Sequence, residues 1–76
     1  LSNFSDIYVL NIKKKFYSII IPIKNQEKTV QNNLTRLLRK LKKIKFLKKW
    51  EIILVDDGST DKTINSILRF KSKHRN

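Results

Sequence analysis

The sequence has no cysteine and no methionine, and it has only one residue each of glycine, proline and histidine. Without cysteine, no disulfide or thiolate–metal site can form, and a lone histidine, His74, is too little for a zinc site. The absence of methionine ahead of Leu1 indicates a chain that was processed, truncated or cut from something longer. With 76 residues, it forms one small domain with a thin core at most.

Acidic residues and long apolar runs are also scarce. Eighteen Lys and Arg outnumber six Asp and Glu, which gives a formal net charge of +12. This charge predicts attraction to anionic partners such as nucleic acid, phosphate-bearing ligands or anionic membranes. No apolar run approaches the roughly 18 residues that a membrane span needs. A lysine-rich composition also arises from AT-rich genomes, so the charge alone assigns no function.

Two β-branched runs predict the strands of an α/β fold. The run YSIIIPI predicts a strand over about residues 17–23, and EIILV predicts a second over about 51–55. Both runs are apolar without alternation, as in parallel strands that are covered on both faces. Helical spacing of apolar residues predicts helices over about 26–44 and 61–71, the first capped by Asn25 with Glu27 in its first turn. The order strand–helix–strand–helix predicts a right-handed crossover between parallel strands.

The remaining segments divide the chain. Residues 1–15 form an N-terminal extension or linker, in which Ile7 and Val9 allow either a short edge strand or no regular structure. The domain itself covers residues 16–76. Phe46 and Leu47, in the connection between the first helix and the second strand, are expected to pack inward.

Two adjacent carboxylates, Asp56 and Asp57, follow the second strand directly. In an open parallel sheet, ligands bind outside the carboxyl ends of the strands, where the loop after Pro22 should also lie. Carboxylates there can accept hydrogen bonds from a base or sugar, or bind a hard cation. The alternative is purely structural, because Asp-Asp-Gly-Ser is also favourable turn chemistry.

Two motifs carry a resemblance to a known family. The stretches YSIIIPIKNQEKTVQNNLTRLL and WEIILVDDGSTDKT resemble the amino-terminal part of a family 2 glycosyltransferase, which has the GT-A fold. The resemblance runs from about Tyr17 to Phe70 and implies a partial, Rossmann-like GT-A domain. It implies a fragment of an enzyme that transfers a sugar from a nucleotide-sugar donor to an acceptor hydroxyl, with inversion in the complete enzyme.

The resemblance also implies roles for particular residues. Asp57 would accept a hydrogen bond from the base of a UDP- or GDP-sugar, and Asp56 would shape the loop near the ribose. Pro22 would line the base and ribose pocket. Lys24 stands where many family members have an aromatic residue, so it would contact a phosphate or solvent instead. Glu27 would either bind the ligand or serve as an ordinary first-turn acid.

The family's metal-binding and catalytic residues are missing. No Asp-x-Asp occurs in the sequence, and Asp61 is its last acidic residue. We therefore expect Mg²⁺ or Mn²⁺ in the complete enzyme, with no metal bound by this chain alone. No catalytic residue can be assigned, because the general base lies outside the chain, which alone should be inactive and marginally folded.

The resemblance places the complete enzyme in cell-envelope polysaccharide biosynthesis, with a lipid-linked or polysaccharide acceptor. It would act in the cytoplasm or at the cytoplasmic face of a membrane. A different function remains open, namely a non-catalytic basic module whose first helix binds anionic membrane or nucleic acid through its cationic face. No sequence-specific nucleic-acid motif is present. A receiver-type phosphoacceptor domain does not fit, because its acid pair follows the first strand.

Overall fold

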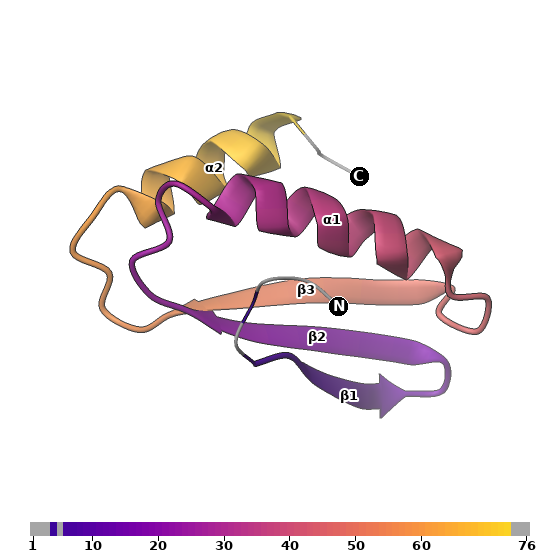
Figure 1. The fold of residues 1–76 in the computed structure, drawn as a ribbon. Coiled ribbons are helices and arrows are strands. Elements are labelled where there is room, and N and C mark those ends of the chain that lie inside the picture. The colour runs from indigo at the N-terminus through magenta and orange to yellow at the C-terminus, as the bar shows by residue number, and fades with distance from the viewer. Residues whose placement is uncertain (1–3, 5, 74–76) are drawn as a thin grey trace.

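The structure, a computed structural model, describes residue 4 and residues 6–73; His74 and the chain end lie outside this range. Its elements follow in the order β1 (Tyr8–Lys13), β2 (Phe16–Ile23), α1 (Val30–Lys43), β3 (Lys49–Asp56) and α2 (Thr63–Lys73). Together they form a small α/β fold of one sheet and two helices (Figure 1). This fold is consistent with part of a GT-A domain.

The three strands form a mixed sheet in the order β1-β2-β3. β2 and β3 are parallel, as the crossover rule predicts, with Phe16 paired to Lys49 and Ile23 paired to Asp56. β1 pairs antiparallel with β2. Of the two interpretations open for this segment, the edge strand is therefore the one that the structure shows, and β2 becomes the central strand. The division of the chain after residue 15 stays a prediction.

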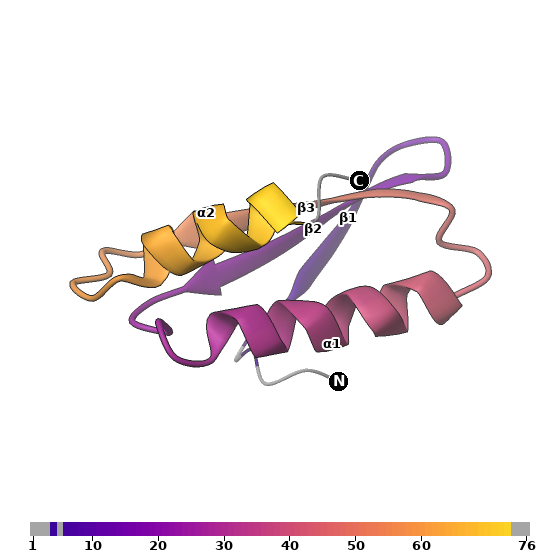
Figure 2. The ribbon, with the colours of Figure 1, turned by 90° about the horizontal axis from the view of Figure 1, so that it is seen from above.

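Both helices lie on one face of the sheet (Figure 1), and from above they run beside one another across it (Figure 2). The core lies between this face and α1. Its best-buried members in the sheet are Ile19, Ile21 and Ile23, which alternate along β2 and so point to the same side. From α1 it receives four residues at helical spacing: Val30, Leu34, Leu37 and Leu41.

The prediction that the second strand is buried on both faces is wrong. In β3, exposed residues alternate with half-buried ones, and Ile53 and Val55 are 41% and 46% exposed. The physical reason is that both helices cover the same face, so the apolar side chains on the other face have no layer above them. On this open face, the hydroxyl of Ser18 donates to Glu51 across the strands at 2.5 Å.

Both helices begin later than the sequence predicts. α1 starts at Val30 rather than 26, and Thr29 rather than Asn25 is its N-cap. Asn25 cannot fill that position because its φ is +50°, in the left-handed region. Glu27 lies in the turn before the helix, so no acid stands in the first turn of α1. α2 covers 63–73 rather than 61–71.

The prediction that Phe46 and Leu47 of the α1–β3 connection both pack inward is correct for Leu47 and wrong for Phe46. Leu47 is buried in the core, whereas Phe46 is 70% exposed and its ring meets that of Tyr17 edge to face. Over the described part of the chain, neither helix has the length and apolar character that crossing a bilayer requires.

Candidate functional site

The candidate site lies at the edge of the sheet where β2 and β3 end side by side. We call residues 22–28 and 56–63 the carboxyl rim. Since the strands are parallel and Ile23 pairs with Asp56, the loops that follow them leave the same edge (Figure 1). The backbone N–H of Asp57 donates to the carbonyl oxygen of Ile23 at 2.8 Å, which extends the pairing one residue beyond the strand.

Asp56 shapes the turn after β3. Its carboxylate is half-buried and accepts a hydrogen bond from the backbone N–H of Ser59 at 3.2 Å, and a second from the Ser59 hydroxyl. Gly58 between them has φ of +74°, a conformation that favours glycine. Asp56 therefore uses its carboxylate to close the turn, which is the structural role that Asp-Asp-Gly-Ser chemistry allows.

Asp57 differs from its neighbour. Its side chain is exposed, and its carboxylate accepts no hydrogen bond from any residue that the structure describes. Its backbone is nevertheless fixed by the bond to Ile23. The rim thus presents one carboxylate held at the end of a parallel strand pair with its oxygens directed to solvent, free to accept N–H or O–H donors from a ligand.

The two loops of the rim are tied together by reciprocal hydrogen bonds, which we call the clasp. Asn25 lies at its outer end. The N–H of Asn25 donates to the Ser59 hydroxyl at 3.0 Å, and the N–H of Thr60 donates to the side-chain oxygen of Asn25 at 2.7 Å. Asparagine tolerates the left-handed backbone that this double contact requires.

The inner part of the clasp joins Gln26 and Glu27 to the start of α2. The N–H of Glu27 donates to Asp61 at 3.1 Å, and the N–H of Lys62 donates back to the Glu27 carboxylate at 3.2 Å. The N–H of Gln26 donates to the buried Thr63 hydroxyl at 2.8 Å. These bonds give acceptors to the N–H groups of residues 25–27, which precede α1 and have no partner within the helix.

Asp61, just before the start of α2, has a lowered pKa. The Thr63 hydroxyl donates to it and lowers its pKa below the usual value; partial desolvation opposes this, and the N–H groups of Glu27 and Thr63 add to the lowering. Hydrogen bonds that favour the ionised form have this effect. Asp61 is therefore charged at neutral pH and acts as a cap for the loop and for the start of α2.

The other predicted site residues lie on the same rim. Lys24 is exposed directly after β2, and no described residue bonds to its side chain. Pro22 is half-buried in the last part of β2, paired with Val55. Since the pairing of β1 reaches only to Ile20, the missing N–H of Pro22 interrupts no bond to that strand. Pro22, Lys24, Asp56 and Asp57 thus come together, and Glu27 joins them through the clasp.

The rim does not form a divalent-metal site. Within residue 4 and residues 6–73, no three His, Cys, Asp or Glu side chains are grouped as metal ligands. The carboxylates of Asp56, Asp61 and Glu27 accept hydrogen bonds from the loop, which leaves only Asp57 with a free carboxylate. One free carboxylate does not supply the oxygen ligands that Mg²⁺ or Mn²⁺ requires.

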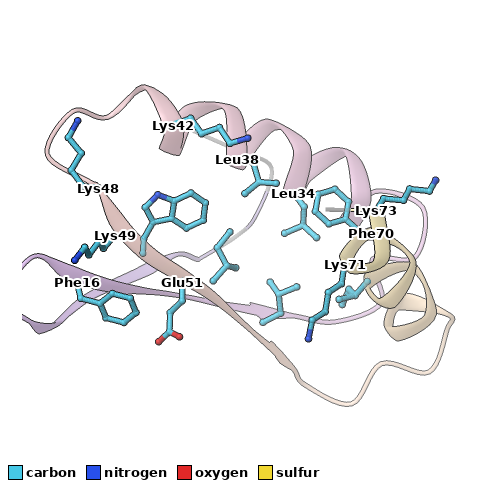
Figure 3. Close-up of a pocket in the computed structure, with 14 residues that line it drawn as sticks. Phe16, Leu34, Leu38, Lys42, Lys48, Lys49, Glu51, Phe70, Lys71 and Lys73 are labelled. Atoms are coloured by element: carbon cyan, nitrogen blue, oxygen red, sulfur yellow. The ribbon is translucent and has the colours of Figure 1, made fainter. Parts of the chain in front are cut away.

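A cavity of about 970 Å³ lies elsewhere. It is a groove between α1, α2 and the first half of β3, with Leu34, Leu38 and Phe70 pointing into it and lysines along its edge (Figure 3). Trp50 and Ile52 line its floor. The sequence predicts these residues only as core or boundary residues, because apolar periodicity does not show where α2 stops covering the sheet.

Comparison with known proteins decides the family. The family model described as "Glycosyl transferase family 2" matches residues 18–76, which include β2 from Ser18 onward, β3, both helices and the whole carboxyl rim. The chain belongs to glycosyl transferase family 2. No solved structure matches the chain at the same level of significance.

Several curated proteins are similar to this family 2 chain over part of their length. A dolichyl-phosphate beta-glucosyltransferase of Trichomonas vaginalis is 34% identical over 64 residues, 80% of this chain and 20% of the relative. An undecaprenyl-phosphate 4-deoxy-4-formamido-L-arabinose transferase of Pectobacterium atrosepticum is 45% identical over 49 residues, 64% of this chain and 14% of the relative. A dolichyl-phosphate beta-glucosyltransferase of Saccharomyces cerevisiae is 41% identical over 54 residues, 71% of this chain and 16% of the relative.

These relatives are glycosyltransferases by name, and the chain spans a fifth or less of their length. The comparison confirms the family that the two motifs indicate. It does not test the individual site residues, whose roles stay predictions.

Proposed function

We propose that the carboxyl rim binds the nucleotide of a nucleotide-sugar donor, a UDP- or GDP-sugar. Asp57 accepts a hydrogen bond from the base N–H, the N3–H of uracil or the N1–H of guanine. Pro22 lies against the base and ribose, Asp56 holds the loop beside the ribose, and Lys24 is placed to reach the diphosphate. Glu27 contributes by holding the two loops of the rim together through the clasp.

One observation carries this proposal, namely the contrast between the two adjacent carboxylates. Asp56 accepts two hydrogen bonds within its own turn, whereas the exposed Asp57 accepts none from the described residues and has its backbone fixed to Ile23. A carboxylate whose backbone is already held makes a charge-assisted hydrogen bond to an N–H donor at the ordering cost of its own side-chain torsions alone. Turn chemistry accounts for Asp56 but leaves Asp57 without a structural partner.

In a full-length enzyme of this family, the bound donor would pass its sugar to an acceptor hydroxyl. The acceptor oxygen forms a bond to the anomeric carbon as the bond from that carbon to the diphosphate oxygen breaks, and a single displacement of this kind inverts the carbon. The nucleoside diphosphate leaves with the electron pair, and the acceptor proton passes to a general base outside this chain. The relatives' names point to a lipid phosphate as a second class of acceptor, and there an ionised phosphate oxygen would attack the anomeric carbon directly, with no proton to remove. The 76-residue chain itself binds nucleotide without transferring sugar.

The test compares two ligands that differ at one atom. UDP and its N3-methyl derivative are titrated into the ¹⁵N-labelled chain, and the amide shifts of residues 22–28 and 56–63 are followed. UDP should give saturable shifts on the rim. N3-methyl-UDP should bind at least tenfold more weakly, because it lacks the donor and places a methyl group against Asp57.

Adding Mg²⁺ provides an internal comparison. Since the rim lacks a set of metal ligands, Mg²⁺ should leave the affinity for UDP nearly unchanged in this chain. Equal affinity for UDP and N3-methyl-UDP would contradict the proposed role of Asp57. So would amide shifts that both UDP and GDP cause only in residues away from the rim.

A further inference from the structure

Charge is distributed unevenly along the molecule. Four of the six acids, Glu27, Asp56, Asp57 and Asp61, lie on the carboxyl rim. The opposite end consists of residues 12–16 and 42–49, that is, the β1–β2 turn, the end of α1 and the α1–β3 connection. We call it the lysine end. It contains no acid and eight exposed lysines: Lys13, Lys14, Lys15, Lys42, Lys43, Lys45, Lys48 and Lys49.

The two segments of the lysine end form one continuous surface. Phe16, which follows the β1–β2 turn, pairs with Lys49 at the start of β3. The rings of Tyr17 and Phe46 meet edge to face with centroids 6.1 Å apart, which ties the α1–β3 connection to the start of β2. Both turns emerge from the same end of the sheet (Figure 1). Lysines that are far apart in the sequence are therefore neighbours in space.

Large apolar side chains project among these lysines. Phe46 is 70% exposed and Ile12 is 57% exposed, one on each segment. Helix-dipole compensation accounts for Lys42 and Lys43 in the last turn of α1. It does not account for Lys13–Lys15, Lys45, Lys48 and Lys49, which lie outside the helices. In the part of the chain that the structure describes, none of the eight lysines forms an ion pair with a carboxylate.

We propose that the lysine end is a docking surface for an anionic phospholipid bilayer. The lysines lie among acidic headgroups, and Phe46 and Ile12 enter the interfacial region. Lasting attachment to a bilayer takes two signals, an apolar insertion and a basic patch, and the lysine end combines both. The cationic face predicted for the first helix contributes only its last turn to this surface.

The aromatic geometry favours a bilayer over nucleic acid. Single-stranded nucleic acid stacks its bases on exposed ring faces along a basic groove. The one ring pair that the described residues form at the lysine end is edge to face, with an interplanar angle of 76°. Lys42, Lys48 and Lys49 border the groove between α1 and β3, but the other five lysines do not line it, so no continuous basic groove runs along the lysine end. An exposed Phe46 adds nothing to the binding of a phosphate backbone, whereas a bilayer interface accepts it.

Docking leaves the carboxyl rim free. The molecule measures about 37 Å along its longest axis, and the two ends of the sheet lie at opposite ends of the strands. Vesicle binding and nucleotide binding should therefore be independent. The docking proposal stands whether or not the rim binds nucleotide.

The experiment is a vesicle-sedimentation assay of the 76-residue chain in about 0.15 M salt, at which exposed charges further apart than about 8 Å are largely screened. Vesicles of phosphatidylcholine with about 30% phosphatidylserine supply the anionic surface, and pure phosphatidylcholine is the comparison. The chain should bind the anionic vesicles and not the neutral ones. Each lysine near such a surface contributes about fivefold, so Lys13→Gln/Lys14→Gln/Lys15→Gln should weaken binding on the order of a hundredfold.

Matched variants separate this surface from net charge and general hydrophobicity. Lys28→Gln/Lys62→Gln/Arg69→Gln removes the same charge elsewhere and should weaken binding much less. Phe46→Ser should weaken binding roughly tenfold, while Leu68→Ser, at a 60% exposed position on α2, should not. Amide spectra of all variants check that the fold is retained.

Two results would overturn the proposal. Equal losses for the two triple-charge variants would show attraction by net charge alone. If Phe46→Ser binds the anionic vesicles as tightly as the wild type does, and the wild type binds duplex DNA as tightly as it binds these vesicles, the lysine end is a general polyanion surface.

Discussion

Asn25 is the residue whose replacement tests the clasp most sharply. Its side-chain oxygen accepts the N–H of Thr60 at 2.7 Å, and its backbone has φ of +50°. Three substitutions separate the contribution of the hydrogen bond from that of the left-handed backbone. Asn25→Asp keeps an acceptor and tolerates the left-handed backbone; Asn25→Gly keeps only the backbone freedom; Asn25→Ala keeps neither.

The structure gives the order and rough size of the effects on the free energy of unfolding. Loss of the hydrogen bond costs about 1 kcal/mol, and a left-handed backbone costs alanine about 1 kcal/mol more than glycine or asparagine. Asn25→Asp should therefore stay within about 0.5 kcal/mol of the wild type. Asn25→Gly should lose about 1 kcal/mol and Asn25→Ala about 2 kcal/mol.

Urea unfolding followed by Trp50 fluorescence measures these differences through the transition midpoint at an unchanged slope. Amide exchange at Thr60 adds a local readout, since it should accelerate in Asn25→Gly and Asn25→Ala but not in Asn25→Asp. If Asn25→Ala unfolds at the wild-type urea concentration, Asn25 does not bridge the loops. Equal losses for Asn25→Gly and Asn25→Ala would refute the contribution of the left-handed backbone.

Four other substitutions test the rim and the sheet by urea unfolding. Because the pKa of Asp61 is lower in the folded than in the unfolded chain, its stabilisation is present above the unfolded pKa and is lost as the pH falls through the folded pKa. Thr63→Val removes the main cause of the lowered pKa, so stability should fall less than that of the wild type on acidification; parallel pH curves would contradict this. The substitution also removes the buried acceptor of the Gln26 N–H, which should cost about 1–2 kcal/mol at every pH. Gly58→Ala should cost about 1 kcal/mol from its φ of +74° alone, because an added Cβ meets nothing within 4 Å; an unchanged midpoint would argue against the left-handed turn. Ile21→Val in the core should cost about 1 kcal/mol and Ile53→Val on the open face only a few tenths; equal costs would mean that this face is covered.

Much of the fold could be predicted from local pattern. The β-branched runs and the helical spacing of Val30, Leu34, Leu37 and Leu41 indicate the four main elements and the parallel pair. The open face of β3 could not be predicted, because an apolar run looks the same whether one or both faces are covered. That difference depends on both helices crossing on the same side of the sheet.

The position of the site could be predicted from the sequence, but the hydrogen bonds that hold its two loops together could not. The order of the elements brings Asp56 and Asp57 to the carboxyl edge beside the end of β2. The hydrogen bonds of the clasp join residues that are separated by 34 to 37 positions in the sequence, so no local sequence pattern indicates them. Glu27 looked like an ordinary first-turn acid, yet its carboxylate accepts a bond from Lys62 in the other loop. Contacts of this range depend on tertiary structure.

The central claim is that Asp57 recognises the nucleotide, and the most direct test is the dissociation constant of UDP for Asp57→Ala. Glu51→Gln is the matched control, because it removes an exposed negative charge in the first half of β3, away from the rim, and keeps an acceptor for the Ser18 hydroxyl. Loss of a charge-assisted hydrogen bond of about 1.5–3 kcal/mol should weaken UDP binding tenfold to a hundredfold in Asp57→Ala, while Glu51→Gln should bind as the wild type does. Equal affinity of the two variants for UDP would contradict the assignment of Asp57 to the nucleotide.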